Sequence, residues 1–364
     1  MVNNRILSIQ KAIVFVFAIF LGTTLGICQD NKKQEIHISE ITNGKKFEWR
    51  PTESAPNQYP IEIHQGIITC QDGSMVEIPS GGRTVHNGWG ETGSTYVVGE
   101  NLKSLPKKLM LSWLSFTEST FYKGDFELPI NKIKTLFDNG YVNHLGRQET
   151  YSNVVVGMAP GGNVSVWLLG ADKSVEVGHY LAHTAEISME EFNPSGIQNR
   201  KKYIAATIDY LPKNIKNQLK KEGVNKEIWN TYRKRFSWKF KYQFKNKSTP
   251  AEIRTKFYNG AHFYFKTNNP EISDYAQLPI PKQIGYKWYD KDKNKFGADI
   301  IFDEQEIFQA FEAIFKNPNN KTVNLIIKVG AYNSSVTLSL ESENETVELN
   351  KAKVNVYKTS DQIK

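Results

Sequence analysis

Cysteine is scarce in this sequence of 364 residues, which contains only Cys28 and Cys70. Two cysteines cannot build a disulfide-rich scaffold, and no spacing between Cys and His residues resembles a zinc site. After the first thirty residues, no apolar run approaches the roughly 20 residues that a membrane-spanning helix needs. These absences exclude a disulfide framework, a zinc finger and a multispan membrane protein.

Motifs for catalysis are missing or incomplete. The sequence has no G-x-S-x-G elbow, and His179 and His183 stand four apart in a strand-like context without the Glu of H-E-x-x-H. The loop that starts at Asp290 begins like an EF-hand but lacks its Gly and its final Glu. Gly88–Gly93 matches G-x-G-x-x-G, but a strand-like rather than a helical pattern follows it. We therefore predict no catalytic residue, no metal and no cofactor, and the balance of patterns is against an enzyme.

The first residues have the pattern of an export signal. Arg5 and Lys11 precede the apolar run Ala12–Leu21, and small residues follow it, so we predict a signal peptide over 1–28. The end of the signal resembles a lipobox, in which Cys28 would be lipidated, although Ile27 stands where a small residue is usual. Lipidation of Cys28 and ordinary cleavage after Gly26 or Cys28 both stay open. Either outcome predicts a periplasmic, outer-membrane-anchored or extracellular protein with a polar tether over 29–45.

Two distant parts of the chain share one order of features. Pro106–Trp113 and Pro281–Trp288 are each followed by a Phe eight residues after the Trp, then by Gly, a helical pattern and a hairpin pattern. We therefore predict an α+β fold of two diverged, β-rich repeat units, each an antiparallel sheet with one covering helix. The predicted helices are 130–137 and 304–315, and the predicted hairpins are 154–168 and 325–340. The predicted units are 46–187 and 235–347, with a helical connector over 188–234 and a tail over 348–364.

Positive charge is concentrated around this connector. Residues 200–245 contain fourteen Lys or Arg and three Asp or Glu, a net charge of +11, whereas the whole chain carries +8. Without Arg5 and Lys11 of the signal the chain carries +6, so everything outside 200–245 has a net charge of −5. A basic stripe of this size fits an acidic partner protein, anionic lipid head groups or a solvated helix face. Export and the lack of a nucleic-acid fold signature are against nucleic acid.

Two segments present residue types that are common in binding sites. The glycine-rich loop 81–93 holds His86 and Trp89, and loops of this kind present contacts to ligands or cap a core edge. Arg233, Lys234 and Arg235 are three consecutive basic residues at the end of the connector. We take these five residues as candidate binding residues, and Cys70 as a buried thiol that packs like a small apolar side chain.

Ordered motifs across residues 80–240 resemble an uncharacterised bacterial domain family, known only as a domain of unknown function, in which many members look like envelope lipoproteins. The motifs that carry the resemblance are Gly88-Trp89-Gly90, Leu105-Pro106-Lys107-Lys108-Leu109, Ala159-Pro160-Gly161-Gly162-Asn163 and Ile228-Trp229-Asn230-Thr231-Tyr232-Arg233-Lys234-Arg235. The resemblance implies a location rather than a reaction. Some family members lie beside type VI secretion effectors, including lipase-like ones, which implies immunity proteins.

These observations together predict an exported, non-enzymatic envelope protein that binds an unknown ligand. The specific version is a periplasmic immunity protein whose partner is a secreted toxin, and an envelope component is the other expected kind of partner. Membrane anchorage would come from a lipidated Cys28. An envelope hydrolase or a carbohydrate-binding accessory protein is the alternative, and a purely structural lipoprotein is a third possibility.

Overall fold

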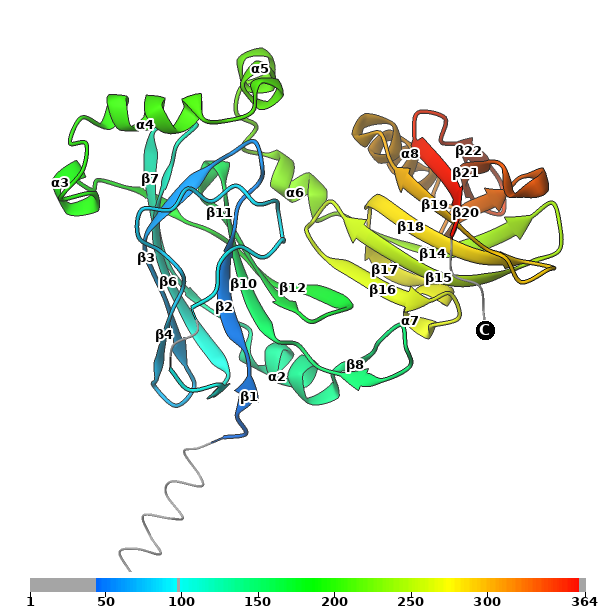
Figure 1. Ribbon diagram of the computed structural model, residues 1–364, viewed down its shortest axis with the longest axis horizontal. Coiled ribbons are helices and arrows are strands. Elements are labelled where there is room, and N and C mark those ends of the chain that lie inside the picture. The colour runs from blue at the N-terminus through cyan, green and yellow to red at the C-terminus, as the bar shows by residue number, and fades with distance from the viewer. Residues whose placement is uncertain (1–43, 97–98, 360–364) are drawn as a thin grey trace, which may run out of the picture.

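The computed structural model describes residues 44–96 and 99–359 (Figure 1). The predicted signal peptide, Cys28 and nearly all of the predicted tether lie outside these residues. Strands predominate over helices, so the chain is β-rich and of the α+β type, as expected. No helix in the described part of the chain is both long and apolar enough to cross a membrane.

The first half of the molecule contains two sheets. One has the order β2 (Arg50–Ser54), β10 (Asn153–Ala159), β11 (Asn163–Leu169), β12 (Lys173–Leu181). The other has the order β13 (His183–Ala185), β7 (Thr120–Glu127), β6 (Pro106–Ser115), β3 (Ile61–Cys70), β4 (Met75–Glu77). Val154 and Val166 of the first sheet share one core with Leu111 and Trp113 of the second, so the two sheets pack face to face. Helix α2 (Ile130–Asn139) adds Ile133 to this core.

The second half has the same plan. One sheet has the order β17 (Ala276–Pro279), β14 (Arg235–Phe244), β20 (Val323–Val329), β21 (Val336–Glu341), β22 (Thr346–Glu348). The strands that face it have the order β16 (His262–Lys266), β15 (Ser248–Phe257), β18 (Pro281–Asp290), β19 (Lys295–Ile301), β23 (Lys353–Lys358). Helix α8 (Glu304–Lys316) buries Ile307, Phe311 and Ile314 in the core. The short elements are β1 (Phe47–Glu48), β5 (Leu102–Lys103), β8 (Tyr141–Val142), β9 (Gln148–Glu149), α7 (Pro270–Ser273), η1 (Pro160–Gly162) and η2 (Ala331–Asn333).

The halves also agree in their irregularities. Strands β3 and β6 change register between Ile63 and Gln65 and again between Thr69 and Cys70. Strands β15 and β18 change register between Pro250 and Glu252 and again between Lys256 and Phe257. In each half the helix leads to a strand that runs parallel to the first long strand of its sheet, β10 beside β2 and β20 beside β14.

The expected layers need a correction, because each half has two sheets and one parallel strand pair rather than a single antiparallel sheet under a helix. The ten residues of α2 span only about 15 Å. A helix of that length cannot cover a four-stranded sheet, so the second sheet does. The strand pairing also moves one expected equivalence by a residue, since Trp113 lies opposite Tyr122 whereas Trp288 lies opposite Phe296.

The predicted C-terminal tail is a second correction. Strand β23 pairs with β19 over six residues, and its Val354 and Val356 pack against the core. An edge strand of alternating apolar and polar residues is part of the second half, which therefore extends to the end of the described chain rather than to residue 347.

The connector forms four helices: α3 (Met189–Phe192), α4 (Arg200–Asp209), α5 (Lys213–Glu222) and α6 (Ile228–Tyr232). Tyr203 and Ile204 of α4 pack on Phe121 and its neighbours, on the outer face of the first half. Gly223 caps the C-terminus of α5, and α6 lies between the two halves (Figure 1). Below α6, β12 pairs with β16 through Lys173 and Ser174, so a continuous nine-stranded sheet joins the halves.

Candidate functional site

The loop around Trp89 lies where the two halves meet. Its backbone is fixed by Ser54, whose hydroxyl donates to the Gly88 carbonyl at 2.7 Å and accepts from the Gly90 N–H at 3.0 Å. Gly90 has a φ of +77°, and a Cβ at this position would lie 2.3 Å from the Gly260 carbonyl oxygen of the second half. Only glycine fits such a close approach between two backbones. Residues 94–96, expected to be strand-like, belong to no strand.

Trp89 belongs to a row of aromatic rings that crosses the junction. Its ring centroid lies 4.9 Å from that of Trp167 in the first half and 5.0 Å from that of Trp229 in the connector. The row continues from Trp229 through Tyr232 to Tyr258 of the second half, at 5.8 and 5.2 Å. Six of the seven tryptophans in the chain are less than 2 % exposed, and Trp89 is the one that is half-buried. Trp89 therefore joins the halves and also keeps part of its ring accessible.

A buried polar network lies beside this row. The carboxylate of Glu176 on β12 accepts hydrogen bonds from Arg233 Nε at 3.1 Å, Ser165 Oγ at 3.0 Å and Asn259 Nδ2 at 3.2 Å. It thus connects the first half, the connector and the second half. Ser165 Oγ also lies 3.0 Å from His179 Nδ1. This is not a hydrolytic triad, because Ser165 is fully buried and its hydroxyl, rather than the imidazole, lies between the other two groups.

The two histidines that stand four apart in the sequence, His179 and His183, lie on different strands. His179 lies on β12 and His183 on β13. Burial, together with the nearby Arg233 charge, lowers the pKa of His179 to about 4, so its imidazole is neutral at physiological pH. Within the described residues, no group of three or more His, Cys, Asp or Glu side chains is placed to hold a metal ion. Cys70 is buried, and burial raises the pKa of its thiol.

The structure separates the candidate binding residues from one another. His86 is exposed on its loop, whereas Trp89 is packed in the aromatic row. The three basic residues point to different neighbours: Arg233 to Glu176, Lys234 to Glu312 of α8 at 2.6 Å, and Arg235 to the Gln277 carbonyl at 3.0 Å. Helix α6 ends just before them and β14 starts at Arg235, so they do not form one free patch.

The Ala159–Asn163 turn, which carried part of the family resemblance, has a structural role. The Glu118 carboxylate is 3 % exposed, and it accepts from the Gly161 N–H at 3.2 Å and from the Tyr122 hydroxyl at 2.9 Å. It also pairs with Lys226 of the connector at 3.0 Å. A Cβ on Gly162 would lie 2.5 Å from the Ala182 carbonyl oxygen. This turn therefore fixes the connector to the first half.

A groove runs along the junction above the aromatic row. It consists of two adjoining cavities of about 550 and 680 Å³, which share Gln58, Tyr232 and Glu304. Trp89, Lys256 and Gln283 line the first cavity, and residues of α5 and α8 line the second. Sequence reasoning found Trp89 but missed the other lining residues, because they come from segments up to 250 residues apart and carry no local motif. We refer to this feature as the junction groove.

Some charged groups of the junction groove have partners within it. Glu91 forms an ion pair with Lys256 at 2.6 Å, and the Tyr232 hydroxyl donates to Glu304 Oε1 at 2.9 Å. Desolvation by the surrounding protein raises the pKa of the Glu304 carboxyl, and the hydrogen bond from Tyr232 and the nearby Lys282 ammonium partly offset this rise. Burial lowers the pKa of His262, at the side of the groove, to about 4. The groove therefore has polar walls with both signs of charge.

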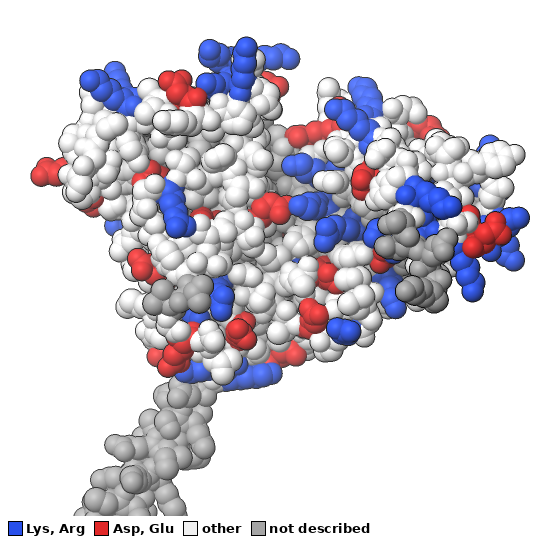
Figure 2. Space-filling view, in the orientation of Figure 1, with Lys and Arg blue, Asp and Glu red and all other residues white. Residues whose placement is uncertain are grey.

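Helices α4 and α5 form a separate, basic surface. Lys and Arg side chains project from the top of the molecule, where α4 and α5 lie (Figure 2). From residue 200 to 222 there are seven basic and two acidic residues. Arg200 and Lys216 bond to backbone carbonyls, but the side chains of five lysines make no hydrogen bond or ion pair with another described residue: Lys201, Lys202, Lys213, Lys220 and Lys221. At the corner between the two helices, Tyr210 is 92 % exposed.

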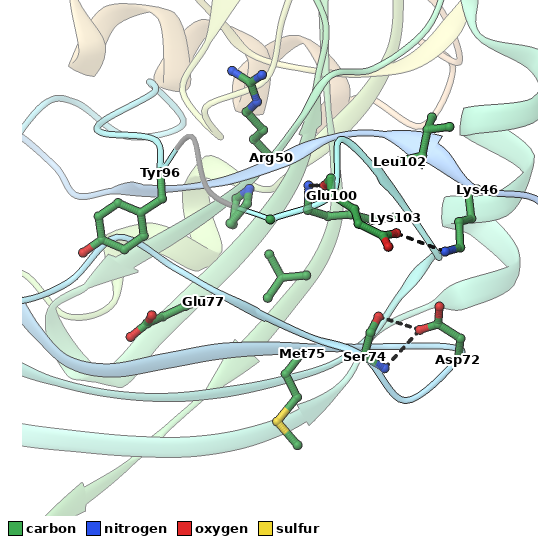
Figure 3. Close-up of a pocket in the computed structure, with 13 residues that line it drawn as sticks. Lys46, Arg50, Asp72, Ser74, Met75, Glu77, Tyr96, Glu100, Leu102 and Lys103 are labelled. Atoms are coloured by element: carbon green, nitrogen blue, oxygen red, sulfur yellow. Dashed lines mark hydrogen bonds and ion pairs between the residues drawn. The ribbon is translucent and has the colours of Figure 1, made fainter.

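A third hollow of about 640 Å³ lies beside β4 and β5 (Figure 3). Lys46 points toward Glu100, with which it pairs at 3.3 Å, and Asp72 accepts from Ser74. Arg50 points away from Met75, so its guanidinium does not converge with these groups. Lys46, Glu100 and Asp72 thus have local partners, and Arg50 does not converge with them, so we take the junction groove and the basic surface as the candidate sites.

A family model described as "Protein of unknown function (DUF2931)" matches residues 29–253. The chain belongs to this family. The match spans the first half, the connector, β14 and the start of β15, a longer stretch than the motifs that carried the resemblance. Comparison with curated proteins and with solved structures gives no match. Because DUF2931 has no assigned activity, the function is argued from the geometry of the sites.

Proposed function

We propose that this DUF2931 protein is an exported, non-enzymatic envelope protein that acts by binding an acidic partner protein through α4 and α5. The observation that carries the proposal is the contrast within the connector. Lys226, Arg233 and Lys234 each pair with a carboxylate of the body, whereas five lysines of α4 and α5 have no such partner. Unneutralised like charges on neighbouring helix turns repel one another, and an acidic partner would relieve that repulsion.

A protein partner suits this surface better than a membrane. Ile215 and Leu219, the apolar residues of α5, are partly buried, and Leu219 packs on Trp229 and its neighbours. A helix that binds lipid keeps its apolar face free for insertion, and α5 does not. The exposed Tyr210 adds the kind of side chain that is enriched at the centre of protein interfaces.

The immunity version of this proposal predicts a stoichiometric complex with a secreted toxin encoded beside the protein. Replacing Lys213, Lys216, Lys220 and Lys221 together by Glu should weaken this complex at least a hundredfold in Kd, because four favourable charges become repulsive. Isothermal titration calorimetry with the purified toxin, at low and high salt, measures the effect. The wild-type affinity should fall as salt rises.

A matched variant separates specific contacts from net charge. Lys291, Lys321, Lys328 and Lys353 lie on the second half and form no ion pair with a described residue, so their replacement by Glu makes the same change in net charge. This control should bind almost as the wild type does. Equal weakening by both variants would show that only the total charge matters, and no complex at all would refute the immunity version.

Export itself is tested by the mass of the mature protein from membranes. A diacylglycerol adduct on Cys28 would establish a lipoprotein, whereas a chain that starts at Ile27 or Gln29 would establish ordinary cleavage. A chain that keeps its first residues would refute export.

The proposal includes a duplicated architecture. We infer that the first half and the second half descend from one unit joined to its copy by the connector. The shared strand order, the parallel pairs β2–β10 and β14–β20, and the two register shifts at corresponding places support this inference. Chance convergence rarely reproduces irregularities of the ladder, because bulges are specific features of a family.

The second candidate function is an envelope hydrolase, and the junction groove favours it because Glu91, Glu304 and His262 all line that cavity. Glycoside hydrolases usually use two carboxyl groups in different environments, one as the general acid and one as the base or nucleophile. Peptidoglycan turnover that is lost in both Glu304→Gln and Glu91→Gln would establish this candidate. A purely structural lipoprotein, the third, predicts neither turnover nor a specific partner.

A further inference from the structure

The junction groove contains hydrogen-bonding groups that the fold does not use. Asn57 and Gln58 lie in the loop between β2 and β3, and Gln283 lies on β18 of the second half. Their side-chain amides all line the groove, and none forms a hydrogen bond with another described residue. Each amide offers both a donor and an acceptor. The first half and the second half thus each present free hydrogen-bonding amides to the groove.

The aromatic row gives the same groove an apolar surface. Trp89 and Tyr232 line it, and both are half-buried, so part of each ring is accessible from the groove. Trp229 beside them is buried, and its indole N–H has no hydrogen-bond partner. Aromatic rings with polar groups around them combine flat apolar contact with directional hydrogen bonds.

In the cavity of the junction groove around Trp89, the balance of charge disfavours a strongly ionic ligand. The cavity around Trp89 is lined by two carboxylates, Glu91 and Glu304, and by two ammonium groups, Lys256 and Lys282. Glu91 and Lys256 neutralise each other directly. A ligand with a net charge would face attraction from one side and repulsion from the other, whereas a neutral polar ligand meets no such penalty.

We infer that the cavity of the junction groove around Trp89 binds a neutral carbohydrate. Sugar hydroxyl groups donate and accept at once, which matches the free amides of Asn57, Gln58 and Gln283. The C–H face of a sugar ring would pack on the accessible parts of Trp89 and Tyr232. The cavity volume of about 550 Å³ lies within the usual range for small-ligand sites. No residue of α4 or α5 lines this cavity, so the site differs from the surface proposed for the protein partner.

Trp89 supplies a direct readout of binding. All seven tryptophans are in the described part of the chain, so a ¹⁵N-labelled protein gives seven indole resonances, one of which belongs to the half-buried Trp89. We would titrate the protein with three probes: triacetylchitotriose, maltotriose and cellotriose. At least one should shift the Trp89 indole resonance saturably, with smaller changes at Trp49 and Trp288 in the two cores.

A pair of variants locates the site. Gln58→Ala with Gln283→Ala removes one amide from each wall and should weaken binding at least tenfold. Gln65→Ala with Asn214→Ala removes two exposed amides outside the groove and should leave the affinity unchanged. The inference is overturned if none of the three sugars shifts Trp89 at millimolar concentration. It is also overturned if the shift persists unchanged in the groove variant, because the sugar then binds elsewhere.

Discussion

The two halves share a strand order, yet they differ in the loops that face the junction. The first half has the Gly88-Trp89-Gly90 loop and the tight turn with Gly161 and Gly162, and the second half has neither. In the first half these loops contact the connector and the second half. Within the described residues, the corresponding end of the second half contacts no further unit. The difference shows that the distinctive motifs of the first half serve the contact between units rather than the fold of one unit.

The exposed edges are consistent with this view. Strand β12 of the first half pairs with β16, whereas β22, which occupies the same place in the second half, is an edge strand. At the other end, β4 is also an edge strand, although the corresponding β16 is paired. Both edges are three residues long, and short edge strands limit pairing between molecules.

The largest expected effect comes from breaking the backbone contact between the halves. Gly90→Ala should destabilise the protein by roughly 3 kcal/mol, because the new Cβ would overlap the Gly260 carbonyl and the residue has a positive φ. Gly285→Ala in the second half is the control, since its Cβ would have no neighbour closer than 3.8 Å. The control should change stability by less than about 1 kcal/mol. Urea unfolding of both variants gives the comparison, and similar values would contradict the close approach.

Removing the carboxylate that holds the connector should have the next largest effect. Glu118→Ala leaves the Gly161 N–H and the Tyr122 hydroxyl without their acceptor, and we expect a loss of about 2 kcal/mol. The matched change in the second half is Glu341→Ala, which removes a longer, partly exposed pair with Lys241 at 3.7 Å. That variant should lose less than about 1 kcal/mol, as is usual for surface pairs. Equal losses, measured by thermal unfolding, would argue against a special role for the turn.

Acid should destabilise both halves through one histidine each. Burial lowers the pKa of His179 and of His262 to about 4, whereas the value in an unfolded chain is about 6.5. Between pH 6.5 and pH 4 the unfolded state therefore binds more protons than the folded state. The contribution of these histidines to the unfolding free energy is fully present above about pH 6.5, and it is lost as the pH falls toward 4. We expect a loss of about 1 to 2 kcal/mol across this window.

Single variants assign that loss to each half. His179→Asn and His262→Asn should each flatten part of the pH dependence of the unfolding free energy, measured by urea titration from pH 7 to pH 4. His179 faces Arg233, and His262 faces Glu91, Lys256, Arg254 and Asp172. A profile that is unchanged in both variants would show that other groups cause the acid sensitivity.

The smallest effect sharpens the comparison of the two hairpin turns. Tyr332, in the second half, has a φ of 57° and is exposed, where the first half has Gly161 with a φ of 77°. Tyr332→Gly should stabilise the protein by no more than about 1 kcal/mol. Relief of the left-handed backbone strain is favourable, but the greater flexibility of glycine in the unfolded chain partly offsets this gain. Gly161→Ala should destabilise instead, since its Cβ would lie 3.0 Å from Lys226 Cβ. Calorimetric melting temperatures test both signs.

Local patterns in the sequence predict the elements well. The apolar periodicity of 130–137 and 304–315 corresponds to α2 and α8, and the alternation of Val164, Val166 and Leu168 corresponds to β11. The sequence does not predict the second sheet of each half, because β3 and β15 are defined by their pairing with distant strands rather than by a local residue spacing. The sequence predicts a tail where β23 lies, because its short alternating pattern resembles a polar chain end.

The site was less predictable than the fold, for a physical reason. Trp89 was identified from its loop, but its partners Trp167 and Trp229 are 78 and 140 residues away in the sequence. The sequence predicts Arg233 as a binding residue because nothing local indicates that Glu176 lies beside it. The lining of the junction groove depends on which segments the nine-stranded sheet brings together, and that information is not local.

The joining of β12 to β16 has a consequence for recognition. Lys173 and Ser174 pair with Phe263 and His262, and the Tyr264 N–H donates to the Asp172 carbonyl at 2.7 Å, so main-chain bonds hold the two walls at a set spacing. The walls are then preorganised rather than hinged like a jaw. When a ligand that fits binds, the protein loses little conformational freedom. A ligand that is too wide cannot bind, because the walls do not move apart. The fixed width of such a site therefore selects ligands by their shape.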